Sequence, residues 1–141
     1  MTSEKAPAQR FLPEPTTLSQ PFWEAARRHE LMIQRCSACE MHVFYPRYNC
    51  PHCGSPDLQW LKASGRGKVY SYTVARRPTH PAFAERVPYV IAIVQLQEGP
   101  RMTANIVGCD PDSVRIDMEV EATFEDVSAD ISLVMFRPVG R

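Results

Sequence analysis

Residues 36–53, CSACEMHVFYPRYNCPHC, contain four of the five cysteines of this 141-residue chain. The cysteines form two Cys-x-x-Cys pairs, with ten residues between the two pairs. Two residues between ligands allow the backbone to turn around one ion, and two such turns supply four thiolates in a tetrahedron. The spacing therefore predicts a zinc ribbon, in which a structural Zn²⁺ is bound by Cys36, Cys39, Cys50 and Cys53.

Two other uses of the four cysteines are weaker interpretations. A rubredoxin-like iron centre has the same four thiolates, and a redox-active dithiol requires a strand-to-helix context that neither pair has. Four thiolates leave no coordination position for water or substrate, so we expect the metal to be structural. A ribbon of about 25 residues has too small a core to fold alone, and the metal is expected to supply much of its stability. Cys109 lies far along the chain and is expected to be an unpaired, unreactive thiol.

The residues around the cysteines fit a ribbon with one exception. Pro51 and Gly54 suit the second turn, whereas the first turn ends at Glu40, where glycine would be easier. His42 and His52 are expected to be exposed loop residues, because four cysteines already complete a metal site.

The charge balance disfavours binding to nucleic acid. Lysine plus arginine and aspartate plus glutamate both number 16, so the formal net charge is zero, whereas counterion release from phosphates relies on a basic surplus. No segment has the roughly 18 consecutive apolar residues that span a bilayer, and the N-terminus, MTSEKAPAQRFLPEPTT, has no apolar signal-peptide core. We therefore expect a cytoplasmic protein, in which paired cysteines bind metal rather than form disulfides.

The chain divides into four expected segments. Residues 1–15 lack hydrophobic periodicity and contain three prolines, which is typical of a flexible arm. Residues 16–33, with TTLSQPFWEAARRHELM, have apolar residues at helical spacing and predict an amphipathic helix. The apolar face of this helix packs either on the same chain or at a subunit interface. Residues 34–62 are expected to form the zinc ribbon, and residues 63–141 an OB-fold.

Five β-strands are predicted after the ribbon. The runs GKVYSYTVA, PYVIAIVQL, RMTANIV, EVEATFE and ISLVMFRP have strand patterns, and turn residues separate them. In the first run, Val69, Ser71 and Thr73 are expected on the face opposite Tyr70 and Tyr72. The second run is almost wholly apolar, which is typical of a strand that is buried on both faces or closed in a barrel. Five strands in about 75 residues predict a mainly β protein with a small barrel or sandwich, and an OB-type barrel fits the count.

The sequence shows no complete catalytic set. The four histidines are scattered, and no nucleophile elbow, Walker loop or dinucleotide fingerprint is present. The acidic run within residues 119–126 is interpreted as a solvated strand face. The loop ARRPTHPAFAERVP is either merely a soluble loop or a site for a phosphorylated, adenine-bearing ligand, because it places arginines beside Phe83. These patterns favour a binding or accessory role over a stand-alone enzyme.

Taken in order, these segments resemble one known family. PFWEAARRHELMIQRC, the ribbon with FYPR inside it, CPHCGSPDLQW, SGRGKVYSYTV and PYVIAIVQLQEGPRM are similar to the acyl-CoA-associated zinc-ribbon/OB-fold family. The resemblance covers roughly residues 18–138. It implies an N-terminal helix, a rubredoxin-like zinc ribbon and a five-stranded OB-fold barrel. The sequence departs from the family at Asp117, where many relatives have glycine, and this leaves the local turn open.

The resemblance also implies a function. Members of this family are non-catalytic accessory subunits that bind or bridge acyl-CoA chemistry. They stabilise a thiolase-like or sterol-carrier-type thiolase or aldolase partner, sometimes with a hydratase-like partner. The four ribbon cysteines match the family's metal ligands one for one. We expect contacts with CoA first at Arg76 and Arg77, and at Tyr45, Pro46 and Arg47.

A single-stranded nucleic-acid-binding zinc-ribbon/OB module is the alternative hypothesis. Both units occur in such proteins, and Tyr70, Tyr72 and Phe124 are available for stacking on bases. However, no stripe of lysine and arginine follows any predicted strand, and glutamates line the fourth strand instead. The accessory-subunit hypothesis therefore ranks first.

Overall fold

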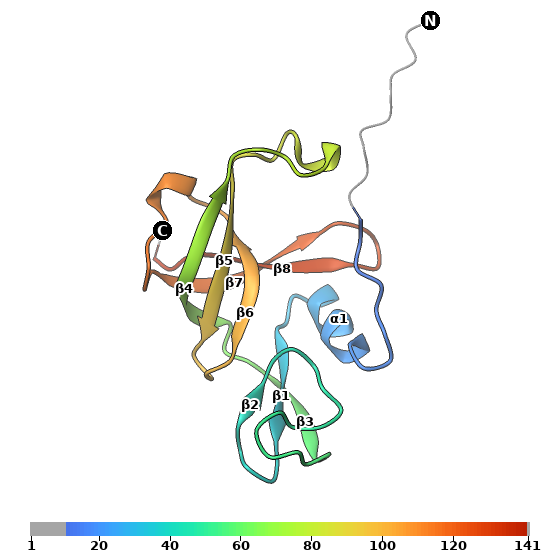
Figure 1. Ribbon diagram of the computed structural model, residues 1–141. Coiled ribbons are helices and arrows are strands. Elements are labelled where there is room, and N and C mark those ends of the chain that lie inside the picture. The colour runs from blue at the N-terminus through green and yellow to red at the C-terminus, as the bar shows by residue number, and fades with distance from the viewer. Residues whose placement is uncertain (1–10, 141) are drawn as a thin grey trace, which may run out of the picture.

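The computed structural model describes residues 11–140, and it contains a small ribbon sheet beside a closed barrel (Figure 1). The elements in chain order are α1 (Gln20–Arg27), β1 (Met32–Cys36), β2 (His42–Val43), β3 (Leu58–Lys62), β4 (Arg66–Ala75), η1 (Pro81–Phe83), β5 (Tyr89–Leu96), β6 (Arg101–Ile106), η2 (Pro111–Ser113), β7 (Glu119–Asp126) and β8 (Ser132–Pro138). The ribbon sheet has the order β2-β1-β3, and the barrel has the order β4-β5-β6-β8-β7. The expected mainly β fold, with a five-stranded barrel of the OB type, is confirmed.

The N-terminal segment is described only in part. The expected flexible arm covers residues 1–15, and its first ten residues lie outside the described range. Residues 11–15 have no regular secondary structure. Within residues 11–140, no helix is long and apolar enough to cross a membrane.

The helix α1 is shorter than the expected range of 16–33. Pro21 occupies its first turn, where the missing N–H costs no hydrogen bond. The helix ends because His29 adopts a left-handed backbone conformation with φ 60°, and its N–H donates to the carbonyl of Ala26. Met32 then begins β1, so the C-terminal part of the expected helix is a strand. The helix buries Phe22 together with Ala25 and Ala26 on the same chain.

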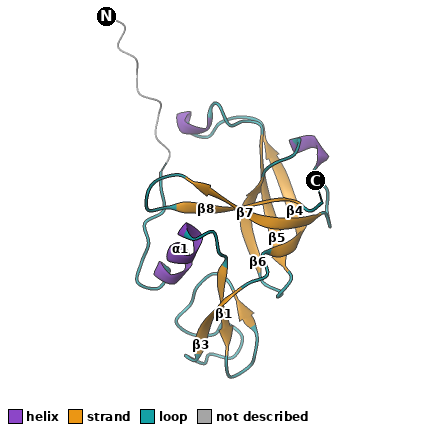
Figure 2. Ribbon diagram, turned by 180° about the vertical axis from the view of Figure 1, so that it is seen from behind, coloured by secondary structure: helices purple, strands orange, loops and turns teal. Residues whose placement is uncertain are grey.

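The helix α1 packs between the ribbon sheet and the strand β8, and the two views agree on this placement (Figures 1 and 2). Direct hydrogen bonds also join the ribbon to the barrel. The hydroxyl of Tyr45, from the ribbon, accepts a hydrogen bond of 3.3 Å from the backbone N–H of Thr103 on β6. The carboxylate of Glu98 accepts one of 2.7 Å from the N–H of Ser64, in the linker before β4. These contacts set the position of the ribbon on the barrel.

A β-bulge changes the expected alternation in β4. The pairing with β5 shifts between Val69 and Ser71, so that Tyr70 is the extra residue. The expected face assignment is therefore wrong beyond the bulge. Val69 pairs with Val94, and Tyr72 pairs with Ala92, so both belong to the side of β4 that faces the buried residues of β5.

The strand β5 has one buried face and one exposed face. The alternate residues Val90, Ala92, Val94 and Leu96 are buried in the barrel core. The side chains of Ile91 and Ile93 are 37% and 38% exposed, although the run is almost wholly apolar. Closure of the barrel explains the buried face, whereas burial on both faces is contradicted. The outer face of β5 therefore presents aliphatic side chains to solvent.

Candidate metal centre and ligand surfaces

The four ribbon cysteines converge on one point. Their sulfur atoms all lie within 4.8 Å of one another. The Sγ atoms of Cys36 and Cys53 are 3.6 Å apart, and so are those of Cys39 and Cys50. In a tetrahedral site with Zn–S bonds of about 2.3 Å, the sulfurs are separated by about 3.8 Å. The four thiolates therefore fit a structural Zn²⁺, and they match the ligand set expected from the sequence.

Each cysteine pair belongs to a tight turn, and the two turns have the same hydrogen-bond pattern. The N–H of Glu40 donates to the carbonyl of Cys36, and the N–H of Gly54 donates to that of Cys50, both at 2.8 Å. Both turns end in a left-handed residue, with φ 67° at Glu40 and 82° at Gly54. Glu40 thus adopts the conformation for which glycine is easier. Its carboxylate lies 3.6 Å from the guanidinium of Arg35.

Without a cation, the environment favours the thiolate form at Cys36 and disfavours it at Cys53. The pKa of Cys36 is lowered to about 7, chiefly because the backbone N–H of Cys39 donates to its sulfur. The N–H of Ser55 lowers the pKa of Cys53, but the neighbouring Cys36 sulfur and desolvation outweigh it and raise the pKa to about 12. Sulfurs this close repel one another as thiolates, and a divalent cation removes that repulsion. The site therefore has the chemistry of a metal site.

The other sulfur and imidazole groups lie outside the cluster of four sulfurs. Cys109 is a free thiol, half-buried against the barrel core. His52 is exposed, as expected, but the expectation for His42 is wrong because it is a half-buried residue of β2 that pairs with Arg35.

A buried glutamine fixes the ribbon hairpin that carries Arg47. The side chain of Gln34 is 3% exposed, and its amide makes two hydrogen bonds to the backbone of Arg47. Its Nε2 donates to the carbonyl at 3.0 Å, and its Oε1 accepts from the N–H at 2.7 Å. The side chain of Arg47 is exposed, and among the described residues it has no ion-pair partner. No sequence pattern indicates this clamp, because its two residues are 13 positions apart on different segments.

The arginines of the loop between β4 and β5 are not equivalent. Arg76 forms an ion pair of 2.7 Å with Asp112, and Arg86 one of 2.8 Å with Glu125. Arg77 is exposed and has no such partner within residues 11–140. The five residues expected to contact CoA therefore lie in two different parts of the molecule. Arg76 and Arg77 lie on this loop, whereas Tyr45, Pro46 and Arg47 lie on the ribbon hairpin beside β6.

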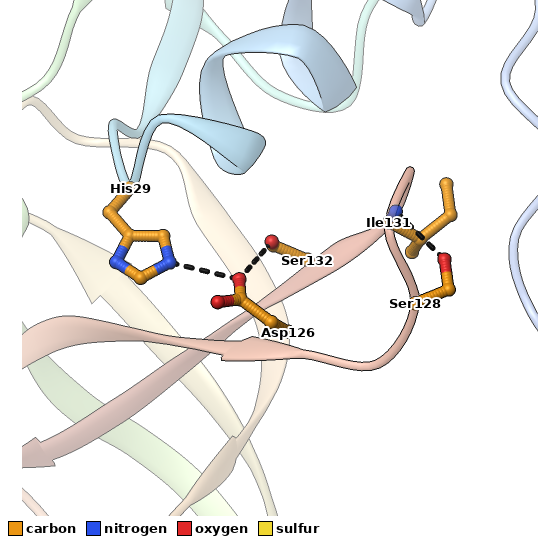
Figure 3. A network of polar contacts seen from close by, with 5 residues as sticks. All are labelled: His29, Asp126, Ser128, Ile131 and Ser132. Atoms are coloured by element: carbon orange, nitrogen blue, oxygen red, sulfur yellow. Dashed lines mark hydrogen bonds and ion pairs between the residues drawn. The ribbon is translucent and has the colours of Figure 1, made fainter.

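The acidic run is more than a solvated face, which corrects the expectation. Glu121 lies between Arg66 and Arg137, at 3.7 Å and 3.2 Å. Asp126 accepts hydrogen bonds from Ser132 and His29, and Figure 3 shows these groups together. The hydroxyl of Ser132 thus donates to the carboxylate and not to the imidazole. This order differs from that of a nucleophilic triad, in which the imidazole accepts the proton of the serine and the carboxylate contacts the imidazole.

Two of the three aromatic residues considered for base stacking have one ring face in contact with another side chain. The guanidinium of Arg101 lies 3.7 Å from the centroid of the Tyr70 ring. The ring of His29 stacks on Phe124, with centroids 5.1 Å apart. Asp117 adopts φ 66°, the conformation that favours glycine, and its N–H donates to the carbonyl of Val69. The departure from the family pattern at this position therefore leaves the turn intact.

A ribbon with four thiolate ligands, joined to a closed five-stranded barrel, defines a zinc-ribbon/OB-fold protein. The family model described as ChsH2, rubredoxin-like zinc ribbon domain, matches residues 23–59. The model described as ChsH2, C-terminal OB-fold domain, matches residues 60–125. The chain belongs to this ChsH2 (DUF35) family of zinc-ribbon and OB-fold proteins.

Several curated relatives are named as subunits or scaffolds. The probable enoyl-CoA hydratase alpha subunit of Thermomonospora curvata is 47% identical over 118 residues, which is 83% of this chain but 36% of that protein. A DUF35 domain-containing scaffold protein of Methanothermobacter thermautotrophicus is 46% identical over 103 residues, covering 72% of this chain and 76% of the relative. The benzoylsuccinyl-CoA thiolase subunit BbsA of Thauera aromatica is 30% identical over 123 residues, covering 85% of this chain and 78% of the relative. This chain thus spans about a third of the Thermomonospora relative.

A solved structure gives the same result. A chain of the structure described as Ltp2-ChsH2(DUF35) aldolase superposes with a TM-score of 0.80 at 42% identity. The match covers 90% of this chain and 98% of that chain.

Proposed function

We propose that this chain is a non-catalytic accessory subunit of a thiolase- or aldolase-type enzyme that acts on acyl-CoA. It would bind or bridge the acyl-CoA chemistry and stabilise a thiolase-like or sterol-carrier-type partner in a hetero-oligomer. Relatives named as thiolase, hydratase and aldolase subunits or as scaffolds support this proposal. The four-thiolate site supports it as well, because a zinc ion with four protein ligands has no position for a substrate.

The observation that carries the proposal is the aliphatic outer face of the barrel. On this face Ile91 and Ile93 are 37% and 38% exposed, and Tyr70 is 47% exposed beneath Arg101. Exposed apolar side chains beside tyrosine and arginine are typical of the centre of a protein–protein interface. We define the docking face as Tyr70, Ile91, Ile93 and Arg101.

The same face argues against the nucleic-acid alternative. The second and third strands of an OB-fold, here β5 and β6, form the surface that binds oligonucleotides in many such proteins. Here the β5 part of that surface carries two isoleucines. Non-specific binding of single strands requires a cationic groove with free aromatic faces, whereas Arg101 covers one face of Tyr70 and His29 covers one face of Phe124.

The CoA contacts are proposed at Arg76 and Arg77 and at Tyr45, Pro46 and Arg47. The two arginines without an ion pair among the described residues, Arg77 and Arg47, have their donors free for phosphate oxygens. The ion pair of Arg76 with Asp112 is exposed on both sides, so little free energy is needed to replace it. The Arg76→Ala/Arg77→Ala double variant is expected to lose affinity for acyl-CoA, and unchanged affinity would count against these contacts.

The experiment that tests the proposed function is co-expression with thiolase-fold proteins of the same organism, followed by affinity purification and size-exclusion chromatography. We expect a stable hetero-oligomer that Ile93→Glu disrupts, because a carboxylate would be buried at the centre of the docking face. Ile116→Glu is the matched control, since Ile116 is 55% exposed on the loop before β7. A chain that associates with no thiolase-fold protein contradicts the proposal, as does turnover of a thioester by the chain alone.

A further inference from the structure

The four ligands of the metal site differ in their exposure to solvent. Cys36 and Cys50 are 0% and 3% exposed, and they form a small apolar cluster with Val43. Cys39 is half-buried and packs against this cluster. Cys53 is exposed, and among the described residues it is the one ligand that neither belongs to the cluster nor packs against it. A small oxidant in solution therefore reaches Cys53 before the other three ligands.

A second sulfur lies within reach of Cys53. The Sγ atoms of Cys53 and Cys36 are 3.6 Å apart, and the two residues belong to different turns of the ribbon. A disulfide bond is about 2.05 Å long, so the two sulfurs need to approach each other by about 1.5 Å. A thiol that binds a metal ion is deprotonated. Cys53 thus combines the three properties of an oxidation-sensitive cysteine, which are thiolate character, exposure and a neighbouring cysteine that can form a disulfide.

Exposure, rather than distance, selects this pair of cysteines. The sulfurs of Cys39 and Cys50 are also 3.6 Å apart. Cys50 is buried, however, and Cys39 is half-buried, so neither residue presents an exposed thiolate to an oxidant. The first bond to form is therefore expected to include Cys53.

We propose that Cys53 is a site of reversible oxidation by hydrogen peroxide, with Cys36 as its resolving cysteine. The thiolate of Cys53 attacks one oxygen of the peroxide, the O–O bond breaks, and the products are a sulfenic acid on Cys53 and a hydroxide ion. The thiolate of Cys36 then attacks the sulfur of Cys53, which forms the S–S bond and releases a second hydroxide ion. The two thiolates supply the two electrons that reduce the peroxide. This inference does not rest on the proposed function.

The disulfide removes two of the four metal ligands. Cys39 and Cys50 remain, and two thiolates bind Zn²⁺ more weakly than four. Because a ribbon of this size has a small core, loss of the metal is expected to loosen the hairpin between the two turns. This hairpin carries Tyr45, whose hydroxyl accepts a hydrogen bond from the N–H of Thr103 on the barrel. Oxidation at Cys53 therefore acts on the placement of the ribbon against the barrel.

Zinc release from the zinc-loaded, full-length protein tests the proposal. Cys109→Ser removes the fifth thiol, so that only the ligands are counted, and this variant is the parent protein. Hydrogen peroxide is added in limiting amount, the released metal is measured with the chelator 4-(2-pyridylazo)resorcinol, and the remaining thiols are counted. We expect two thiols to be lost for each zinc released. Dithiothreitol and added zinc should restore both, because a thiolate cleaves a disulfide by exchange. Zinc that stays bound even in excess peroxide overturns the inference.

Peptide mapping identifies the bond. Trypsin places the first cysteine pair in the peptide 36–47 and the second pair in the peptide 48–62. The disulfide between Cys36 and Cys53 joins these two peptides, and N-ethylmaleimide then labels the other two ligands. A bond within either peptide, a bond between other cysteines, or a sulfinic acid on Cys53 without a disulfide overturns the inference.

Two histidine variants test the role of Cys53. Zn²⁺ accepts three cysteines and one histidine as ligands, so Cys53→His keeps a complete ligand set but has no thiolate at the exposed position. Its rate of zinc release by peroxide should fall at least about tenfold. Cys39→His is the matched control, because it has the same ligand types but retains Cys53 and Cys36, and it should release zinc at the rate of the parent. Equal rates in the two variants overturn the inference, and the peptide map of the parent remains decisive if Cys53→His does not bind zinc.

Discussion

The imidazole Nε2 of His29 lies 2.9 Å from Oδ1 of Asp126, a residue 97 positions later in the chain (Figure 3). The same carboxylate accepts a hydrogen bond from the hydroxyl of Ser132, and the imidazole stacks on Phe124 with an interplanar angle of 6°. His29 belongs to the turn that ends α1, whereas the other three residues belong to β7 and β8. The contact therefore fastens the turn before the ribbon to the barrel.

The contact predicts a pH-dependent stability. The pKa of Asp126 is lowered, chiefly by the hydroxyl of Ser132 and next by His29. A carboxyl group whose pKa is lower in the folded state contributes stability above its unfolded pKa of about 3.9, and this contribution is lost as the pH falls through the folded pKa. Asp126→Asn should therefore lower the melting temperature at neutral pH. The difference from the unmodified protein should shrink as the pH is lowered below about 4.

Thermal unfolding between about pH 7 and pH 3 checks this expectation. Asp130→Asn is the matched control, because Asp130 is an exposed aspartate of the neighbouring loop without an ion-pair partner among residues 11–140. A gap between Asp126→Asn and the unmodified protein that stays constant over this range would contradict the electrostatic explanation.

The parts that sequence reasoning predicted are those with a local pattern. Two Cys-x-x-Cys pairs specify the metal site because each pair is a single turn of the backbone. The five strands were predicted because runs rich in β-branched residues are separated by clusters of turn residues. The sequence also marks Glu40 as a position where glycine would be easier, because Gly54 ends the second turn at the equivalent place. Both residues adopt a left-handed backbone conformation.

The parts that it missed depend on residues brought together by the fold. Nothing around Tyr70 indicates a bulge, and the shift in register moves Tyr72 to the other face of β4. The pair of His29 and Asp126 and the clamp of Gln34 on Arg47 require the relative placement of the helix, the ribbon and the barrel. The length of α1 was overestimated, because a helical pattern does not reveal that His29 adopts φ 60°.

The zinc site predicts a loss of metal and of stability in Cys36→Ser. The sulfur of Cys36 is buried and lies 3.6 Å from that of Cys53, so the serine variant lacks one of four ligands. We expect elemental analysis to give one zinc per chain for the unmodified protein and less for the variant, with a lower melting temperature. Cys109→Ser is the control that should keep the full zinc content, because Cys109 is not part of the cluster. Equal zinc content in the two variants would contradict the assigned ligands.

The start of β4 predicts that Gly67 tolerates no side chain. A Cβ atom at this position would lie 2.6 Å from the carbonyl oxygen of Gln95 and 2.9 Å from Cγ1 of Val94. Both neighbours belong to the paired strand β5, so the backbone has to shift. Gly67→Ala should therefore reduce the free energy of unfolding by about 1–3 kcal/mol. Denaturant unfolding measures the change, and Lys68→Ala on the adjacent exposed position is expected to have a small effect.

The clamp in the ribbon predicts a specific cost for Gln34→Leu. Leucine fills a similar volume, but it leaves the N–H and the carbonyl of Arg47 without the partners they have at 2.7 Å and 3.0 Å. A hydrogen bond within the protein contributes about 0.5–1.5 kcal/mol on balance, so the loss of two should lower the free energy of unfolding by about 1–3 kcal/mol. Gln59→Leu on the exposed side of β3 is the matched control and should be nearly neutral. Equal stability of the two leucine variants would show that the clamp does not hold the hairpin.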